Sequence, residues 1–292
     1  MAFMKFVVQT LLNQAVAASS GGISNTGLMD AFTQPEDISE HGHLIDWLFM
    51  YTTSMNIFFF TLVCIGLFGF CYLYSAKRHP VAYYTYGNKK AHVFVATAIG
   101  LSVFLAVDMN ITRISNDDYT GVFINWPKAE EDDSEEIFRV QVMGQQWAWN
   151  FRYAGKDGRF NTADDPVFLN KLHLPANKKI VVQMISKDVI HSLYLPNARR
   201  KVDAIPGRVT RIWFQLNKPG MYDVACAEMC GTYHYRMQAK MRVHGKESFQ
   251  TWMAEAERKA IQENDPNDVD RFWGWAWEPS TKNNESKEVS MR

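Results

Sequence analysis

Cysteine is scarce in this sequence, and neither sign of charge is in excess. Only four of the 292 residues are cysteine, and Cys64 and Cys71 lie in an apolar stretch, so a disulfide framework is excluded. The 31 basic residues balance the 31 acidic ones. A chain with zero formal net charge does not attract nucleic acid electrostatically, and we expect no nucleic-acid partner. The length is sufficient for one or two domains with a hydrophobic core.

Charged residues are also missing from two long stretches. The first, residues 47–76, would form a helix of about 45 Å, which exceeds the ~30 Å hydrocarbon thickness of a bilayer. The second, residues 91–107, has about the minimum length for a membrane span, and a buried helix of a soluble protein is its alternative. Because the two stretches follow each other closely, we predict a transmembrane hairpin over residues 47–114.

The charges around these stretches predict the orientation of the hairpin. Basic residues lie between the spans, at positions 77–79 and 89–90, whereas the segment before the first span is acidic. The positive-inside rule places the hairpin loop in the cytoplasm and everything after Asp108 on the opposite side, which in a bacterium is the periplasm or the exterior. Residues 1–46 precede the hairpin. They begin with a weak signal peptide or a short membrane-surface helix, which a Ser- and Gly-rich linker follows.

After an acidic run at residues 130–136, the sequence changes to short strand-like segments. Apolar and polar residues alternate most clearly at 211–216 and 238–243. We predict six strands, at residues 137–142, 147–153, 179–186, 211–216, 221–224 and 238–243. Short strands at this spacing predict an all-β sandwich or barrel, here residues 115–245. Residues 246–292 follow as an amphipathic helix, 246–261, and a tail with an aromatic cluster at 272–277.

The remaining two cysteines stand among other soft metal ligands. Cys226, Cys230, His234 and Met237 lie within twelve residues, on a loop between two predicted strands, and His191 precedes Cys226 by 35 residues. Copper is the metal that this ligand set suits best. A disulfide between the cysteines and a structural zinc site are the alternatives, but neither gives the methionine a role. Two thiolates shared by two copper ions, each also holding one imidazole and one weak ligand, would use every residue.

At this point the chain resembles subunit II of haem-copper cytochrome c oxidases, from the first span to about residue 244. The resemblance rests on the two-span hairpin, on GQQWAW at 144–149, DVIHS at 188–192 and DAIPGR at 203–208, and on the loop 226–237. It implies a cupredoxin-like sandwich that carries the dinuclear copper centre called CuA. The ligands that it implies are His191, Cys226, the main-chain carbonyl of Glu228, Cys230, His234 and Met237.

The resemblance also implies roles for residues near the copper ligands. The side chain of Glu228 would reach a magnesium or manganese ion at the boundary with subunit I. Trp147 matches the tryptophan where electrons enter from cytochrome c, although Ala148 replaces the tyrosine that usually follows. The family often has a glutamate near the cytoplasmic end of the second span. This sequence has Lys90-Ala91-His92 there instead of a carboxylate, and His92 would either substitute as the titratable group of a proton pathway or simply lie at the interface.

The function that the resemblance implies is electron transfer. The chain would be a non-catalytic subunit in a bacterial inner membrane, with cytochrome c, haem-bearing subunit I, the other oxidase subunits and membrane lipid as partners. A membrane-tethered copper chaperone is the alternative, but such proteins have one span and a thioredoxin-like fold. The sequence contains no C-x-x-C-H motif for attached haem. We expect the oxygen-rich segment 157–165 to be a polar turn rather than a calcium site. His173 and His244 have no cluster of metal ligands around them in the sequence, and we expect them to be ordinary surface or core residues.

Overall fold

The computed structural model describes residues 34–81, 84, 86–127, 137–162 and 164–263. These residues form two compact units, a helical one that includes His41–Trp126 and a β unit that includes Asp37–Glu40 and the chain from Pro127 onwards. Four predicted features lie outside the described residues: the signal peptide or surface helix, the linker after it, the acidic run and the aromatic cluster.

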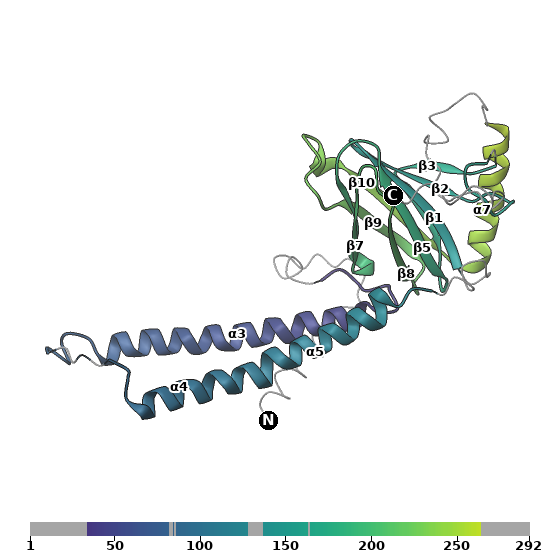
Figure 1. The fold of residues 1–292 in the computed structure, drawn as a ribbon. Helices are drawn as coiled ribbons and strands as arrows, with labels where there is room; N and C mark the ends of the chain where they lie inside the picture. The colour runs from purple at the N-terminus through teal and green to yellow at the C-terminus, as the bar shows by residue number, and fades with distance from the viewer. Residues whose placement is uncertain (1–33, 82–83, 85, 128–136, 163, 264–292) are drawn as a thin grey trace, which may run out of the picture. The chain divides into compact units, whose positions relative to one another are not determined.

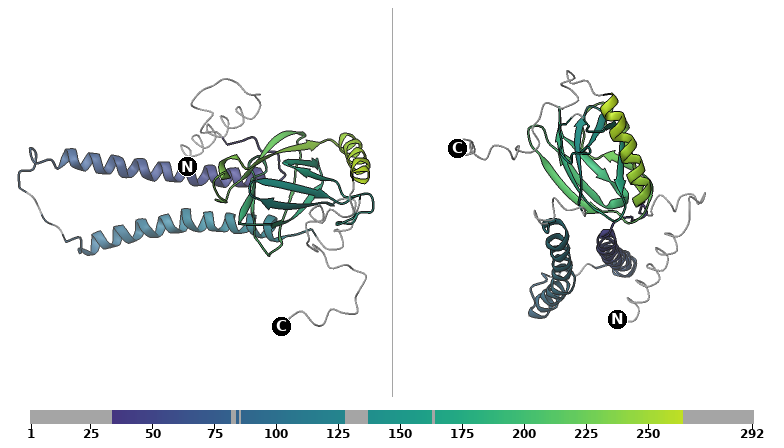
Figure 2. Two further views of the ribbon diagram at one scale, coloured as in Figure 1. Left: turned by 90° about the horizontal axis from the view of Figure 1, so that it is seen from above. Right: turned by 90° about the vertical axis from the view of Figure 1, so that its right-hand side faces the viewer.

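The helical unit is a hairpin of two long helices (Figure 1). The first is α3, Gly42–Leu73. The second is continuous but changes its winding, from α4 at Lys90–Val103 through the π-helical η1 at Phe104–Asp108 to α5 at Met109–Asp118 and the π-helical η2 at Tyr119–Ile124. Both helices are long and apolar enough to cross a membrane, as the sequence predicted. Figure 2 shows them as two separate rods joined at one end.

The second helix continues well past the apolar stretch that predicted it. Its last turns are polar, and interactions one turn apart along the helix support them. Arg113 and Asp117 form an ion pair at 3.5 Å, and the hydroxyl of Thr120 donates to the carbonyl of Asn116 at 2.8 Å. Hydropathy therefore located the apolar part of this helix but not its end, because backbone hydrogen bonding does not stop where the sequence becomes polar.

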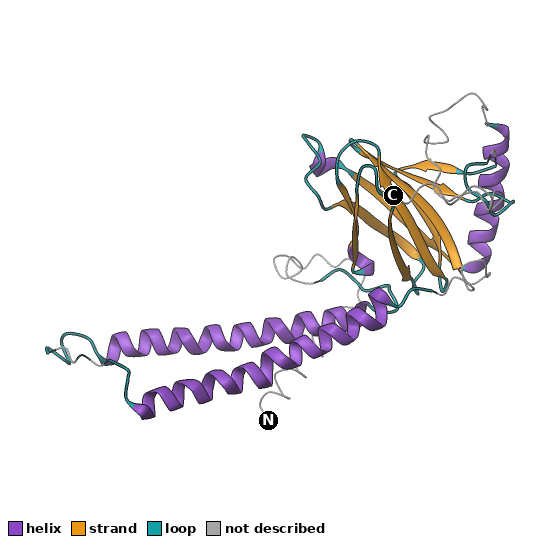
Figure 3. Cartoon of the chain, in the orientation of Figure 1, coloured by secondary structure: helices purple, strands orange, loops and turns teal. Residues whose placement is uncertain are grey.

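The β unit is a sandwich of two five-stranded sheets, shown in orange in Figure 3. One sheet has the order β3-β2-β1-β5-β8 and the other β4-β10-β9-β6-β7. The strands are β1 Ile137–Gln145, β2 Ala148–Tyr153, β3 Val167–Leu169, β4 Lys171–Pro175, β5 Lys179–Ser186, β6 His191–Leu195, β7 Arg200–Ala204, β8 Thr210–Gln215, β9 Gly220–Cys226 and β10 Gln238–His244. The fold class, a helical hairpin plus an all-β cupredoxin-like sandwich, is confirmed.

The core lies between the two sheets and follows the predicted alternation. In β10, Ala239, Met241 and Val243 are buried, while the residues between them are exposed. From the facing sheet β2 contributes Trp149 and Phe151, both fully buried. All six predicted strands are present. Strands β3, β4, β6 and β7 were not predicted, because these segments are only three to five residues long.

One helix packs against the sandwich, close to the predicted segment. Helix α7, Lys246–Gln262, begins directly after β10, with Gly245 as its N-cap residue. Its buried residues are Phe249, Ala256 and Ala260, spaced so that they lie on one face. Figure 2 shows the helix lying along one side of the sandwich.

Candidate metal centre

Strands β9 and β10 bring the two ends of the cysteine tract together. They are antiparallel neighbours, and the N–H of Cys226 donates to the carbonyl of Met237 at 3.1 Å. The segment between them is a loop that closes with a 3-10 turn at His234–Arg236. Because both ends of the loop are fixed by sheet hydrogen bonds, its ligands start from well-defined backbone positions.

The two thiols face each other inside this loop. Their Sγ atoms are 3.7 Å apart, both cysteines are free, and Cys226 and Cys230 are 9% and 3% exposed. The sulfur of Cys230 lies 3.5 Å from Nδ1 of His234 and 3.7 Å from the sulfur of Met237. The sulfur of Cys226 lies 3.3 Å from the carbonyl oxygen of Glu228. The predicted ligands of the tract are therefore neighbours in space.

His191 joins the cluster from another strand. It is the first residue of β6, where the sequence suggested a loop, and it is fully buried. Its Nδ1 atom lies 4.0 Å from the sulfur of Cys226, and its Nε2 atom lies 2.8 Å from Oδ1 of Asp188. The carboxylate therefore fixes the ring so that Nδ1 faces the thiols, a common arrangement for histidine ligands. His191, Cys226 and Cys230 form a group able to hold a metal ion.

Asp188 also connects His191 to the loop that carries Trp147. Its other oxygen, Oδ2, accepts a hydrogen bond of 2.6 Å from the N–H of Gln146. The side-chain amide of Gln146 in turn donates to the carbonyl of Cys230 at 2.8 Å. The β1–β2 loop is thus tied to both halves of the ligand set, although no sequence pattern singled out Gln146.

Trp147 lies beside this cluster but is only partly exposed. Its ring packs edge-on against Tyr233, with centroids 4.8 Å apart, and Tyr233 is 47% exposed. A Cβ atom on Gly231, where φ is +120°, would approach the Trp147 ring to 3.2 Å. The tryptophans Trp149 and Trp213, by contrast, are buried.

The pKa values of the two thiols shift in opposite directions. Burial alone raises the pKa of the Cys226 thiol, but hydrogen bonds to His191 and the main chain outweigh it, and the net pKa is lowered. For Cys230, burial and then the negative charge of Cys226 raise the pKa well above its usual range. Ionisation of one thiol therefore opposes ionisation of the other, and a metal that takes both sulfurs must displace the proton that remains.

The donors are arranged in a way that fits two copper ions. Each sulfur has one imidazole and one weaker donor beside it, His191 and the Glu228 carbonyl near Cys226, His234 and the Met237 thioether near Cys230. Thiolate, imidazole and thioether are ligands that copper prefers. A single tetrahedral zinc ion would take two sulfurs and two imidazoles and leave the other two donors unused.

Two other predictions concern residues away from these ligands. The carboxylates of the 157–165 segment accept hydrogen bonds from its own main chain, for example from Asn161 and Thr162 to Asp165, as expected of a polar turn. The sequence indicated ordinary surface or core positions for His173 and His244, and it did not predict the pair that they form. Their rings are hydrogen-bonded to each other across neighbouring strands, 71 residues apart in sequence, and no local pattern indicates such a pair.

Comparisons with known proteins agree with this geometry. Residues 162–243 match the family described as the periplasmic domain of cytochrome c oxidase subunit II. The alternative cytochrome c oxidase subunit 2 of Bradyrhizobium diazoefficiens is 33% identical over 220 residues, which are 67% of this chain and 74% of that protein. Cytochrome c oxidase subunit 2 of Thermostichus vulcanus is 41% identical over 113 residues, 39% of this chain and 32% of that one.

Among solved structures, one similar chain is the periplasmic domain of cytochrome oxidase subunit II from Bradyrhizobium japonicum. It is 32% identical, with a TM-score of 0.38, and the alignment covers 46% of this chain and 97% of that one.

Proposed function

The chain belongs to the cytochrome c oxidase subunit II family, and on this premise we propose that it is the electron-transfer subunit of a respiratory terminal oxidase. In this proposal it accepts electrons from cytochrome c at a dinuclear copper centre and passes them to haem in subunit I, where oxygen is reduced to water. The chain is then a non-catalytic subunit whose partners are cytochrome c, subunit I, the other oxidase subunits and membrane lipid.

The arrangement of donors around the two thiols is the observation that supports this proposal most strongly. The proposed ligands are His191, Cys226, the Glu228 carbonyl, Cys230, His234 and Met237. A thiolate-bridged copper pair supplies reversible one-electron transfer when bound. The protein's part is to hold these donors, exclude water and set the charge around them.

The backbone around the donors favours fast electron transfer, because it limits rearrangement. Cys226 and Met237 are joined by a main-chain hydrogen bond at the ends of β9 and β10. His191 is fixed by β6 and by the carboxylate of Asp188. Donors that are held in this way change position little between two oxidation states.

Cytochrome c would approach the face that carries Trp147 and Tyr233. Acidic residues such as Asp188 and Asp223 would attract a basic partner. We expect the rate of association with cytochrome c to fall steeply as ionic strength rises. We expect Trp147→Phe to slow electron transfer without changing the copper spectrum. An association rate that does not change with salt would contradict the electrostatic part of the proposal.

Spectroscopy of the copper-loaded full chain in detergent tests the proposal directly. We expect purple absorption and an electron paramagnetic resonance signal from one unpaired electron shared by two copper ions. The same signal is expected in Cys71→Ser, a matched control on α3, and no such signal in Cys226→Ser. A single blue copper, silent zinc, or one Cu(I) ion that transfers readily to an acceptor would contradict the proposal, and the last result would favour the copper chaperone.

The proposal includes the placement of the chain. The two helices would anchor it in a bacterial inner membrane, with residues 47–114 as the hairpin and 115–245 as the copper domain on the periplasmic or extracellular side, followed by 246–292.

The exposed side chain of Glu228 would reach a magnesium or manganese ion shared with subunit I. His92, exposed in the first turn of α4, would be an interfacial residue. Unchanged proton uptake in His92→Ala would agree with that role.

A further inference from the structure

A stack of rings joins helix α7 to the sandwich. His173 on β4 and His244 on β10 have their Nδ1 and Nε2 atoms 2.9 Å apart. Trp252 of α7 lies flat on His173, with ring centroids 4.3 Å apart and planes at 3°. Ser248, also on α7, has its hydroxyl 3.0 Å from Nδ1 of His244. Two titratable rings therefore take part in the contact that holds this helix, together with the rings of Phe138, Tyr153 and Phe168.

The hydrogen bonds of the stack are complete when both imidazoles are neutral. If the Ser248 hydroxyl donates to Nδ1 of His244, the Nε2–H of His244 donates to Nδ1 of His173. The main-chain N–H of His173 donates to the hydroxyl of Tyr153 at 2.7 Å. One added proton on the pair keeps a hydrogen bond between the rings, whereas two added protons place two N–H donors against each other.

We propose that the stack of His173, His244 and Trp252 is a pH-sensitive latch, which holds α7 on the sandwich at neutral pH and releases it in acid. Positive groups on both strands of the pair oppose its protonation, and the other packed elements contribute neutral groups. β4 contributes Lys171 and β10 contributes Arg242, both positive. β2 contributes the neutral phenol of Tyr153, and α7 contributes neutral Ser248 and the Trp252 ring.

The titration of the pair sets the direction of the effect. Burial, then His244, Arg242 and Lys171, lower the pKa of His173 to about 4, and burial and Arg242 also lower the pKa of His244. A histidine whose pKa is lower in the docked state than in the released state binds its proton on release. Its contribution to docking is therefore complete above pH ~6.5 and is lost as the pH falls towards about 4.

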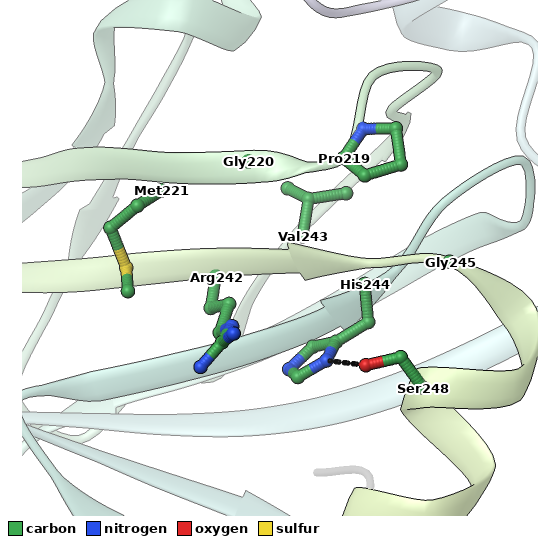
Figure 4. A pocket seen from close by; sticks show the side chains of 8 residues that line it. All are labelled: Pro219, Gly220, Met221, Arg242, Val243, His244, Gly245 and Ser248. Carbon is green, nitrogen blue, oxygen red and sulfur yellow. Dashed lines mark hydrogen bonds between the residues drawn. The ribbon is translucent and has the colours of Figure 1, made fainter.

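A pocket gives solvent a path to the latch. It has a volume of about 440 Å³, and its lining includes Arg242, His244 and Ser248. Figure 4 shows Arg242 and His244 pointing to the same side of β10, with Ser248 bonded to the imidazole. His244 is only 5% exposed, and it lines this opening.

Hydrogen–deuterium exchange of the full chain in detergent tests the latch. Exchange is measured from about pH 7 down to about pH 4, corrected for the intrinsic effect of pH, with residues 179–186 of β5 as an internal reference. We expect the opening of residues 246–262 to increase at least about tenfold across this range while β5 stays protected. An unchanged α7, or opening of α7 and β5 together, would overturn the proposal.

Variants separate the latch from ordinary acid sensitivity. His173→Gln keeps a hydrogen-bonding side chain that does not titrate, and we expect it to reduce the acid response of α7. His43→Gln, at an exposed position on α3, is the matched control and should respond as the wild type does. A full acid response in His173→Gln would overturn the proposal.

A second variant decides the outcome if His173→Gln already releases α7 at neutral pH. Trp252→Phe keeps both histidines but weakens the stack, so α7 should open at a higher pH than in the wild type. The same midpoint in Trp252→Phe and in the wild type would overturn the latch.

Discussion

His191 near the metal centre and His173 next to α7 are both histidines of the same sandwich, yet their pKa values shift in opposite directions. Burial acts to lower the pKa of both. For His191, hydrogen bonds to Cys226 and Asp188 outweigh burial and raise the pKa. For His173, His244, Arg242 and Lys171 add to burial and lower the pKa to about 4.

The difference shows that the partners of a buried imidazole decide its behaviour. An acceptor or a negative group stabilises the protonated ring, and it also orients a ring that is to bind a metal. A second imidazole and nearby cations keep the ring neutral, so that proton uptake opposes packing. Strand β10 connects the two regions, because it begins after Met237 and ends at His244.

The largest effect is expected from removing one of the two sulfur ligands of the proposed copper centre. Cys226→Ser should reduce the oxidation of cytochrome c by the assembled oxidase at least ~100-fold, because a lost ligand costs more than a lost outer partner. The acid response of α7 should stay unchanged, since the two regions use different groups. Stopped-flow kinetics and hydrogen exchange measure the two quantities. A change in the α7 response would show that the regions are coupled through β10.

A smaller effect is expected when the partner of His191 loses its charge. Asp188→Asn should weaken copper binding about 10–100-fold, because the imidazole loses its orienting acceptor. Competition with a chelator measures the affinity. Asp223→Asn is the matched control, since that carboxylate lies on the exposed part of β9 and pairs with Lys240. Equal affinities in the two variants would contradict the positioning role of Asp188.

At the other region, truncation of the stacked ring should weaken the attachment of α7. Trp252→Ala removes the ring that covers His173 and should destabilise the docked helix by about 2 kcal/mol, less than for a fully buried tryptophan. Exchange rates of residues 246–262 give this free energy directly. The copper spectrum should not change. An altered spectrum would contradict the independence of the two regions.

The smallest effect is expected from removing an exposed ion pair that lies between the two regions. Lys240 of β10 pairs with Asp223 of β9, and both side chains are 62% exposed. Lys240→Ala should change the free energy of unfolding by less than ~0.5 kcal/mol, because exposed ion pairs gain little in water. Chemical denaturation measures it. A loss well above that value would mean that β10 is more strained than its regular pairing with β9 indicates.

The sequence predicted some elements well because their signals are local. The alternation at residues 238–243 directly reflects which side chains face the core, and β10 has that pattern. The uncharged stretch at 47–76 predicted α3 for the same reason. Strand β6 was missed because its burial comes from the strands on either side, which no local pattern of five residues reveals.

The grouping of the candidate metal ligands was predicted in part. Cys226, Cys230, His234 and Met237 lie on one loop, so their spacing alone suggested a common site. The contribution of Gln146, which bonds the carbonyl of Cys230 from a different loop, has no counterpart in local spacing. Such contacts depend on which loops the sandwich brings together at one end.

The sequence by itself therefore determined the apolar helices, the strand character of the second unit and the soft donors of one loop, because each depends on neighbours within a few residues. Only the tertiary structure placed His191 against Cys226, set Asp188 behind it, and joined His173 to His244. The physical reason is that β-sheet pairing creates contacts between distant segments, and burial and partner charge then fix how each side chain titrates.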